Sequence, residues 1–184
     1  MDYRVGELVK TYRKAIDKAK DEGEFIGDCS FCHFPRGCCG DASYLLAEYL
    51  KKNGIETIWV SNSNDETSHA WLVIKDDRVT GPSREENSLP EEIKPIIERY
   101  GGQFPSQQDK AKYYQYRDIR NGLIIDITVD QFASWDDIYI GDMDSFHQAF
   151  RFIEAHDYVG LNDLNGRLER LYGTIKKYLK EGDK

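Results

Sequence analysis

Hydrophobic side chains recur in the first part of the chain with the spacing of α-helices. In residues 2–22 they mostly follow one another at intervals of three and four, which gathers them on one helical face. Their positions are Val5, Leu8, Val9, Tyr12, Ile16 and Ala19. A second run of this kind begins at Gly40 and ends at 53-NG-54, a dipeptide typical of helix C-termini. We predict helices over 2–22 and 40–52, joined by a glycine-rich loop.

Two segments after the second helix have the composition of β-strands. Residues 55–61 (IETIWVS) and 68–74 (SHAWLVI) are rich in β-branched and aromatic side chains, which fit a pleated sheet. A third strand is predicted over 122–129 (GLIIDITV). The remaining predicted elements are helices over 91–100, roughly 144–156 and 162–180. Because no repeat or linker divides these elements, we predict a single α+β domain covering residues 1–184.

The composition narrows the class of protein. A chain of 184 residues that is 40% hydrophobic and 32% charged can bury a real core. The longest apolar runs, such as 123-LIIDI-127, are too short to span a bilayer, and the first twenty residues lack the apolar centre of a signal peptide. We therefore expect a cytoplasmic protein, or one delivered to another cell, with no membrane partner. The net charge of −8 and the lack of a basic stripe argue against nucleic acid.

Four cysteines lie close together, and one of them stands where a helix begins. Cys29, Cys32, Cys38 and Cys39 are too near in sequence for disulfides to staple distant segments. Cys39 directly precedes the second predicted helix, whose N-terminus lowers the pKa of a thiol and favours the nucleophilic thiolate. Cys38, one residue earlier, is expected to point elsewhere.

The glycines around Cys39 fit a reactive thiol. Gly37 and Gly40 would let a substrate approach closely and would leave backbone N–H groups free to bind an oxyanion. Asp41, in the first turn, is expected to stabilise the helix because its negative charge lies at the positive end of the helix dipole.

A nucleophilic thiol needs a base and a group that orients the base. Of the four histidines only His69 opens a convincing strand; His147 and His156 are expected on the surface or in the core. Asp126 is a lone acid inside an apolar strand, where burial is costly unless a partner such as an imidazole is present. An aspartate that accepts a hydrogen bond from Nδ1–H would fix the tautomer. Cys39, His69 and Asp126 therefore form a candidate triad.

Each of these residues also has a purely structural interpretation. Cys39 could be a small buried hydrophobe and His69 a satisfied core histidine. Asp126 could bond a loop backbone, with Asp130 as a rival for its role, although Asp130 has the position of an N-cap. Trp71 shares the face of His69 and is either part of the substrate cleft or, more simply, a packing residue.

A metal site is the competing interpretation of the cysteines. Cys29, Cys32 and Cys38, with a distant histidine, are ligands that zinc accepts. An adjacent Cys-Cys makes a poor second ligand pair, because neighbouring side chains diverge. We expect no metal. The alternative is a small zinc-stabilised interaction domain, which about one equivalent of bound zinc would support.

The segments GCCGDASYLLAEYL, SHAWLVI and IIDITVDQF together resemble the papain-like/transglutaminase-like cysteine enzyme superfamily, which includes cysteine peptidases, transglutaminases and arylamine N-acetyltransferases. They also resemble a group of small bacterial proteins that carry the same three segments. The resemblance covers residues ~34–132. It implies a central helix headed by the nucleophile Cys39 and packed on an antiparallel sheet. The sheet would carry the base His69 and the orienting Asp126, with extra helices at the C-terminus.

One departure from the pattern bears on the chemistry. Papain-like peptidases place a glutamine a few residues before the cysteine to complete the oxyanion hole, and this chain has none there. Transglutaminase-like and acetyltransferase members rely more on backbone amides, so the departure favours that branch. Gln131 or Ser30 could take the place of the missing glutamine by folding back.

The resemblance implies a thiol-dependent acyl-transfer enzyme that forms a thioester. With water as acceptor it would be a peptidase or amidase, and with an amine a transglutaminase or acyltransferase. The expected partner is a peptide, a protein or a small amide or acyl substrate, with no organic cofactor. The alternative from another class is a catalytically silent binding or immunity-type module of the same fold.

Overall fold

The computed structural model describes residues 3–63, 66–79, 99, 119–132, 135–150, 152–161 and 165–179. Within these ranges the protein is an α+β fold with four α-helices and one five-stranded sheet. The helices are α1 (Tyr3–Asp21), α2 (Cys39–Lys52), α5 (Ser145–Gln148) and α6 (Arg167–Leu179), with short 3₁₀ helices η1 (Phe31–His33) and η2 (Val129–Gln131). The strands are β1 (Thr57–Ser63), β2 (Ser68–Ile74), β3 (Ile124–Asp126), β4 (Tyr139–Gly141) and β5 (Phe152–Asp157).

The sheet has the strand order β4-β3-β2-β1-β5, and every neighbouring pair is antiparallel. Strands β1 and β2 form a hairpin whose register runs from Thr57 opposite Ile74 to Ser63 opposite Ser68. Strand β3 pairs with β2 near the middle of that strand, with Ile125 opposite Leu72. Strand β2 is therefore central, and a long connection separates it in sequence from β3.

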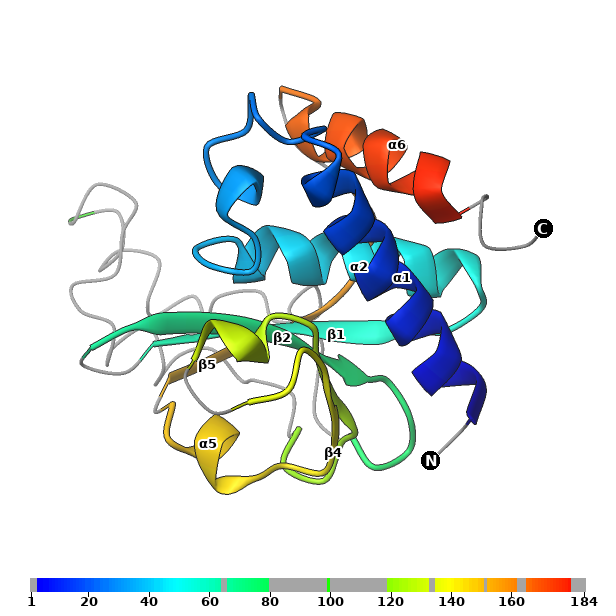
Figure 1. Ribbon diagram of the computed structural model, residues 1–184. Helices are drawn as coiled ribbons and strands as arrows, with labels where there is room; N and C mark the ends of the chain where they lie inside the picture. The colour runs from blue at the N-terminus through cyan, green and yellow to red at the C-terminus, as the bar shows by residue number, and fades with distance from the viewer. Residues whose placement is uncertain are drawn as a thin grey trace.

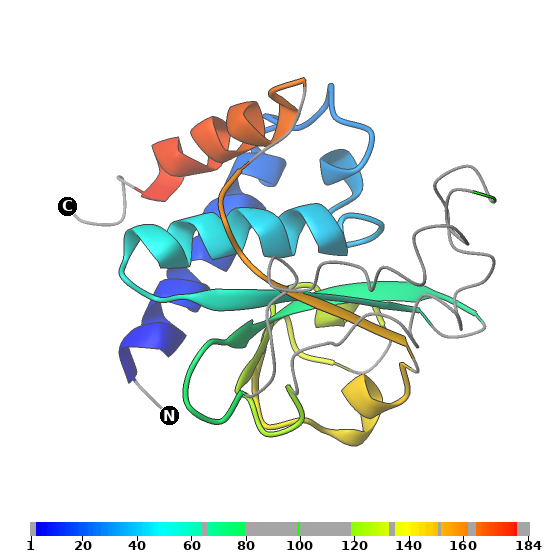
Figure 2. The same cartoon turned by 180° about the vertical axis from the view of Figure 1, so that it is seen from behind.

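Helices α1, α2 and α6 cover one face of the sheet, and α5 lies on the other face (Figures 1 and 2). Alternate residues of β2 serve the two faces, because side chains alternate along a strand. Leu72 packs with the three helices, whereas Trp71 and Val73 join a second cluster with Phe150. The protein thus has a hydrophobic core on each side of the sheet.

The predicted helices over 2–22 and 40–52 and the strand over 68–74 are confirmed almost to the residue. The apolar positions of α1 and α2 are buried, so the 3.6-residue period marks the faces that pack on the sheet. The strand predicted over 55–61 lies two residues later, since pairing with β2 continues to Ser63.

The prediction of a helix over 144–156 is wrong for most of that segment. Helix α5 ends at Gln148, and residues 152–157 form strand β5. Strand β5 pairs with β1 from Ile58 opposite Asp157 to Ser63 opposite Phe152, and these hydrogen bonds override a short apolar pattern that fits either element. The strand predicted over 122–129 is also shorter. Its end is fixed by Asp126, whose Oδ1 accepts a hydrogen bond from the Thr128 N–H.

The helix predicted over 162–180 is confirmed as α6, with a later start at Arg167. The helix predicted over 91–100 lies outside the described residues apart from Arg99. In the part of the chain that the structure describes, no helix combines the length and the apolar character needed to cross a membrane.

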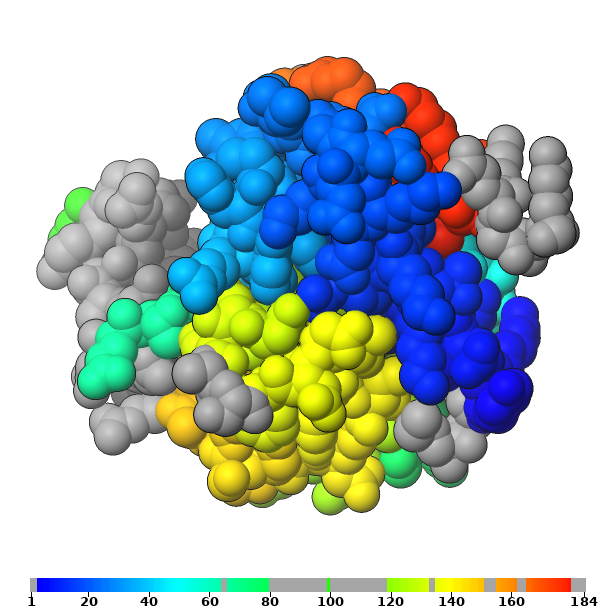
Figure 3. Space-filling model, viewed as in Figure 1, coloured from blue at the N-terminus to red at the C-terminus, as the bar shows by residue number. Residues whose placement is uncertain are grey.

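One buried arginine connects α1 to the segment that follows β3. Arg13 is 5% exposed and donates to the Ile127 carbonyl (2.7 Å), the Asp137 carbonyl (2.5 Å) and both carboxylate oxygens of Asp130 (3.1 and 2.7 Å). The blue surface of α1 lies directly against the yellow surface of this segment (Figure 3). Asp130 is therefore an ion-pair partner of Arg13; the N-cap of η2 is Thr128, so the expectation of an N-cap at Asp130 is wrong.

Candidate active site

Cys39 is the first residue of α2, which begins one residue earlier than the sequence predicted, and its side chain is partly exposed. The preceding Cys38 is the N-cap residue, and its side chain makes no capping hydrogen bond to the first turn. Cys38 is 2% exposed and points its Sγ at the Pro35 carbonyl (3.4 Å). Burial raises the pKa of the Cys38 thiol from 9.0 to about 12. The adjacent thiols thus differ in environment, and only Cys39 is accessible.

The loop before Cys39 is held by an arginine that no sequence pattern singles out. Arg167, at the start of α6, donates to Asp28 in the loop (2.6 and 2.8 Å) and to Asp41 in the first turn of α2 (2.6 Å). Asp28 also accepts from the N–H groups of Ser30 and Phe31. These contacts fix both sides of Cys39, and they give Asp41 an ion-pair partner besides the helix dipole.

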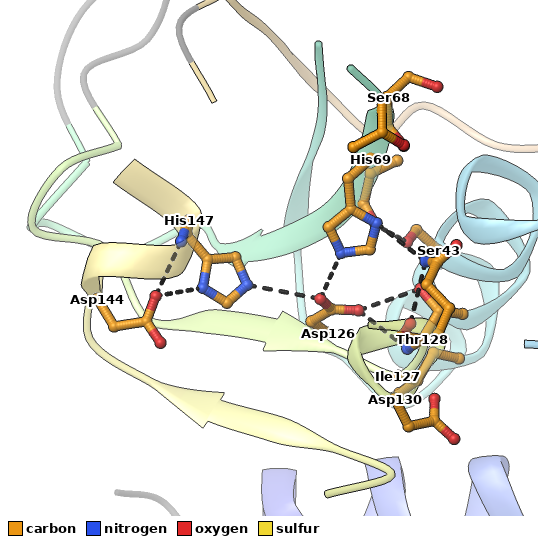
Figure 4. Close-up of polar contacts among 12 residues, drawn as sticks. Ser43, Ser68, His69, Asp126, Ile127, Thr128, Asp130, Asp144 and His147 are labelled. Carbon is orange, nitrogen blue, oxygen red and sulfur yellow. Dashed lines mark hydrogen bonds and ion pairs between the residues drawn. The ribbon is translucent and has the colours of Figure 1, made fainter. Parts of the chain in front are cut away.

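His69, the second residue of β2, and Asp126, the last residue of β3, are in direct contact (Figure 4). His69 is 1% exposed and Asp126 is fully buried. The Nε2 of His69 lies 2.6 Å from the Oδ2 of Asp126. An ionised carboxylate can only accept, so Nε2 carries the hydrogen of a charge-assisted bond. The two residues that the sequence interpretation paired are therefore in direct contact.

Cys39 is the third member of the group. The charge of Cys39 is among the influences that raise the pKa of the His69 imidazole. The start of α2 is held against β2 by Ser43, a buried residue whose hydroxyl donates to the Ala70 carbonyl (3.2 Å). This bond joins the turn that carries Cys39 to the strand position next to His69. Ser43 was missed in the sequence, where nothing indicates that it faces a strand.

The electrostatics of the group favour its charged form. Burial lowers the pKa of His69, but the hydrogen bond to Asp126, the interaction with Cys39 and both charges outweigh it and raise this pKa from 6.5 to about 9. Burial would raise the pKa of Asp126, but the ion-pair contact with His147, the hydrogen bonds from His69 and Thr128 and the charge of His69 lower it from 3.8 to about 2. Asp126 is therefore ionised at neutral pH, and its charge stabilises an imidazolium at His69.

The ring nitrogen that meets the aspartate differs from the expectation. The sequence interpretation placed Nδ1–H against Asp126, whereas the structure places Nε2 there and leaves Nδ1 on the other side of the ring. Nδ1 lies 3.1 Å from the Nε2 of Gln131. The Gln131 amide also donates to the Thr128 carbonyl (3.0 Å), which identifies its nitrogen. The Gln131 contact therefore requires a lone pair on Nδ1.

Because Asp126 faces Nε2, Nδ1 is the His69 nitrogen that is left for the Cys39 thiol, and the Gln131 amide already donates to it. Gln131 stabilises the neutral imidazole, while Cys39 and Asp126 stabilise the imidazolium. A neutral amide bond contributes about 1 kcal/mol, and bonds between charged groups contribute roughly twice as much. The charged form is favoured on this comparison. Gln131, expected at the oxyanion position, instead lies against the base.

We predict that Gln131→Ala makes Cys39 more reactive. Removing the competing donor frees Nδ1 to pair with the thiolate, and about 1 kcal/mol corresponds to about a fivefold faster alkylation near pH 6. Peptide mass spectrometry of iodoacetamide-treated protein measures this rate. Gln148→Ala is the matched control, because the exposed Gln148 amide bonds only the Met143 carbonyl among the contacts described. A slower rate in Gln131→Ala would show that Gln131 supports the imidazole instead of competing for it.

A second histidine, expected on the surface or in the core, belongs to this group. His147 is fully buried, and its Nε2 lies 3.5 Å from Oδ2 of Asp126 (Figure 4). Its Nδ1 lies 2.7 Å from Oδ1 of Asp144, which also caps the backbone N–H of His147. No local pattern in the sequence connects His147 with Asp126. His156, by contrast, packs between Tyr44 and Trp59.

The other residues predicted to line the substrate cleft are Trp71, Gly37, Gly40 and Ser30, and their surroundings differ. Trp71 is fully buried beneath His69 (ring centroids 5.6 Å apart), so it packs and does not face a substrate. Gly37 has a positive φ of 72°, a conformation that favours glycine. A Cβ at Gly40 would meet Trp59 at 3.8 Å, an ordinary contact. Ser30, the other stand-in for the missing glutamine, lies beside Cys29.

The remaining cysteines lie in the loop before α2. Cys29 is exposed, and Cys32 is partly exposed and donates to the Cys29 carbonyl (3.6 Å). Among the residues that the structure describes, no three His, Cys, Asp or Glu side chains gather as a metal site would require. A hollow of about 740 Å³ lies at the opposite end of β2, where Lys75 and Arg78 line it, and includes no triad residue.

The protein is thus an α+β protein in which a thiol at the start of a helix, an imidazole and a carboxylate come from α2 and from the adjacent antiparallel strands β2 and β3. Comparisons of the chain with models of protein families, with curated proteins and with solved structures found no match.

Proposed function

We propose that the protein is a thiol-dependent acyl-transfer enzyme in which Cys39, His69 and Asp126 act as a catalytic triad. The observation that carries the proposal is the buried 2.6 Å contact between His69 and Asp126, on a strand that Ser43 joins to the start of α2, where Cys39 lies. A core histidine needs neither an ionised buried aspartate nor an accessible cysteine beside it. Perturbed titrating groups around an exposed nucleophile are typical of active sites.

The three residues divide the reaction as follows. Nδ1 of His69 takes the proton of the Cys39 thiol, and the thiolate attacks the carbonyl carbon of an amide, which moves an electron pair to the carbonyl oxygen. When the carbon–nitrogen bond breaks, the His69 imidazolium gives its proton to the leaving amine and a thioester remains. A water or amine then loses a proton to His69 as it attacks, and the thiolate leaves. Asp126 holds the imidazolium throughout.

The start of α2 supplies a candidate for oxyanion binding. The first-turn N–H groups of Cys39, Gly40 and Asp41 receive no side-chain cap from Cys38. Such amides and the helix dipole favour a negative oxygen next to Cys39. A hole made of backbone amides fits the transglutaminase-like and acetyltransferase branch, in which no glutamine precedes the cysteine.

The fold is consistent with this assignment. The helix headed by Cys39 packs on an antiparallel sheet whose adjacent strands β2 and β3 carry His69 and Asp126. This is the arrangement that the papain-like/transglutaminase-like resemblance implies, and we propose that architecture. The proposed substrate is a peptide, a protein or a small amide, and the acceptor is water or an amine.

Alkylation by iodoacetamide tests the proposal without a known substrate. We expect Cys39 to be labelled well below the pH of ~8.5 at which a free thiol titrates. In His69→Ala the labelling near pH 6 is expected to fall by about tenfold or more, because a thiol without an imidazolium partner is mostly protonated there. Peptide mass spectrometry reads each cysteine separately, so buried Cys38 is an internal control.

His156→Ala is the matched variant, since His156 contacts Trp59 and Tyr44 and not the triad. It is expected to leave the labelling of Cys39 unchanged. Equal labelling of Cys39 and Cys38, or no effect of His69→Ala, would refute the triad. The protein would then be better explained as a binding module that keeps these residues for structure.

A further inference from the structure

The aspartate of the proposed triad touches two histidines, and the mechanism above uses only one. Oδ2 of Asp126 lies 2.6 Å from Nε2 of His69 and 3.5 Å from Nε2 of His147. Asp144 continues the row at 2.7 Å from Nδ1 of His147 (Figure 4). The four side chains form an alternating chain of carboxylates and imidazoles, from the partly exposed Asp144 to His69.

The two ring nitrogens of His147 can both carry a hydrogen, which suits a position between two carboxylates. Both of its ring nitrogens face carboxylate oxygens, and ionised carboxylates only accept hydrogen bonds. Both contacts are favourable only when both nitrogens carry a hydrogen, and a fully buried imidazole of that kind needs charged partners. Asp126 supplies one negative charge and Asp144 the other. His147 thus faces Asp126 across an ion-pair contact of 3.5 Å, and its Nε2 has no hydrogen-bond partner in the part of the chain that the structure describes.

The surroundings keep His147 in this orientation. The rings of Trp71, Tyr139 and Phe146 each lie with their centroids 5.0 Å from the His147 ring. Asp144 fixes the ring by accepting from Nδ1 and also accepts from the backbone N–H of His147. The titratable groups that face His147 are Asp144 beside α5, Asp126 on β3 and Tyr139 on β4.

Asp126 has one fixed oxygen and one shared oxygen. Oδ1 accepts from the N–H and the hydroxyl of Thr128 (2.9 and 3.1 Å). Oδ2 lies between His69 and His147. Among the described contacts, the only hydrogen-bond donor to Oδ2 is the imidazole that Asp126 has to orient, and His147 supplies a second, ion-pair contact to that oxygen.

We propose that His147, held by Asp144, is a positioning residue that aims the Asp126 carboxylate at His69. Its effect on the reactive thiol rests on the proposed function, whereas its effect on the His69 ring does not. His147 acts through Asp126 and does not touch the substrate.

Three variants separate positioning from simple support of the fold. His147→Leu removes both ring contacts at similar size. His147→Gln is the conservative variant, since its amide nitrogen can reach the place of Nε2 and donate to Asp126. Asp144→Asn keeps an oxygen to cap α5 but removes the charge that holds His147. Asp144 is partly exposed, so this variant is the one to use if His147→Leu does not fold.

The first readout is the pH profile of Cys39 alkylation. His147→Leu is expected to slow alkylation near pH 6 by about tenfold, since small misplacements of a catalytic group cost up to ~10²-fold. His147→Gln should recover to within about threefold of the wild type. Asp144→Asn should shift the profile in the same direction as His147→Leu. If Cys39 is activated in the wild type and both His147→Leu and Asp144→Asn keep the wild-type pH profile, His147 is not a positioning residue. The proposed function would stand in that case.

The second readout is ¹⁵N NMR of the histidine rings, which needs no reactive cysteine. His147→Leu should shift the His69 Nε2–H signal relative to the wild type. An unchanged His69 signal would overturn the proposal even if Cys39 proves unreactive. A shifted signal with an unreactive Cys39 would keep the contact and reject the proposed function.

Discussion

Asp126→Asn is expected to slow the acylation of Cys39 by about 10³-fold or more. The reason lies in the Thr128 contacts. The N–H and hydroxyl of Thr128 hold Oδ1 of Asp126, so the asparagine oxygen takes that place and its NH₂ group faces Nε2 of His69. Nε2 must then accept, the proton moves to Nδ1, and the lone pair that should receive the thiol proton is lost. The burst of nitrophenolate from 4-nitrophenyl acetate measures acylation.

Asp76→Asn is the control, because Asp76 pairs with Arg78 at the surface and not with the triad. Unchanged acylation in Asp126→Asn would contradict the assignment of Asp126 as the orienting group. Asp126→Asn should also change how the unfolding free energy depends on pH. The pKa of His69 is raised from 6.5 to about 9. The stabilisation of the folded state by the His69 imidazolium is therefore complete below pH 6.5 and is lost as pH rises to about 9.

The Asp126 contribution has the opposite sign. Its pKa is lowered from 3.8 to about 2, so its contribution is present above pH 3.8 and lost as pH falls to about 2. The difference in unfolding free energy between wild type and Asp126→Asn should therefore be largest between pH 3.8 and 6.5. Urea denaturation across this range measures it, and a difference that grows above pH 9 would contradict the direction of the His69 shift.

Arg13→Met is expected to lower the unfolding free energy by about 3 kcal/mol, because removing one partner of a buried ion pair strands the other. The change leaves the Asp130 carboxylate, which is partly exposed, and the carbonyls of Ile127 and Asp137 without their donor. Gln131 follows Asp130 directly, so a loosened η2 should also weaken its contact with His69. Urea denaturation gives the stability change.

Two further variants sharpen this test. Lys10→Met, at an exposed site of α1 paired with Glu7 at 3.9 Å, should change stability by no more than ~0.5 kcal/mol. Adding Asp130→Asn to Arg13→Met should restore part of the loss, since the stranded charge is removed. If Lys10→Met costs as much as Arg13→Met, the loss comes from the helix surface and not from the buried network.

The candidate triad was readable from the sequence because each member carries a local signal. Cys39 stands before a helical period, His69 opens a strand, and Asp126 interrupts an apolar run. The partners that refine the site carry no such signal. Ser43, Arg167 and His147 lie among ordinary helix residues, and their roles depend on which segments pack against them.

The sequence by itself determined α1 and α2, because periodic apolar residues bury a face wherever the rest of the chain lies. It also determined β2, because β-branched and aromatic side chains fit a pleated sheet. It also determined which residues could act as nucleophile, base and orienting acid. Tertiary structure decided that residues 152–157 pair as β5, since β1 offers a free edge to a segment with a weak pattern of its own. It also decided which His69 nitrogen meets Asp126, 57 residues away, because ring orientation depends on distant neighbours.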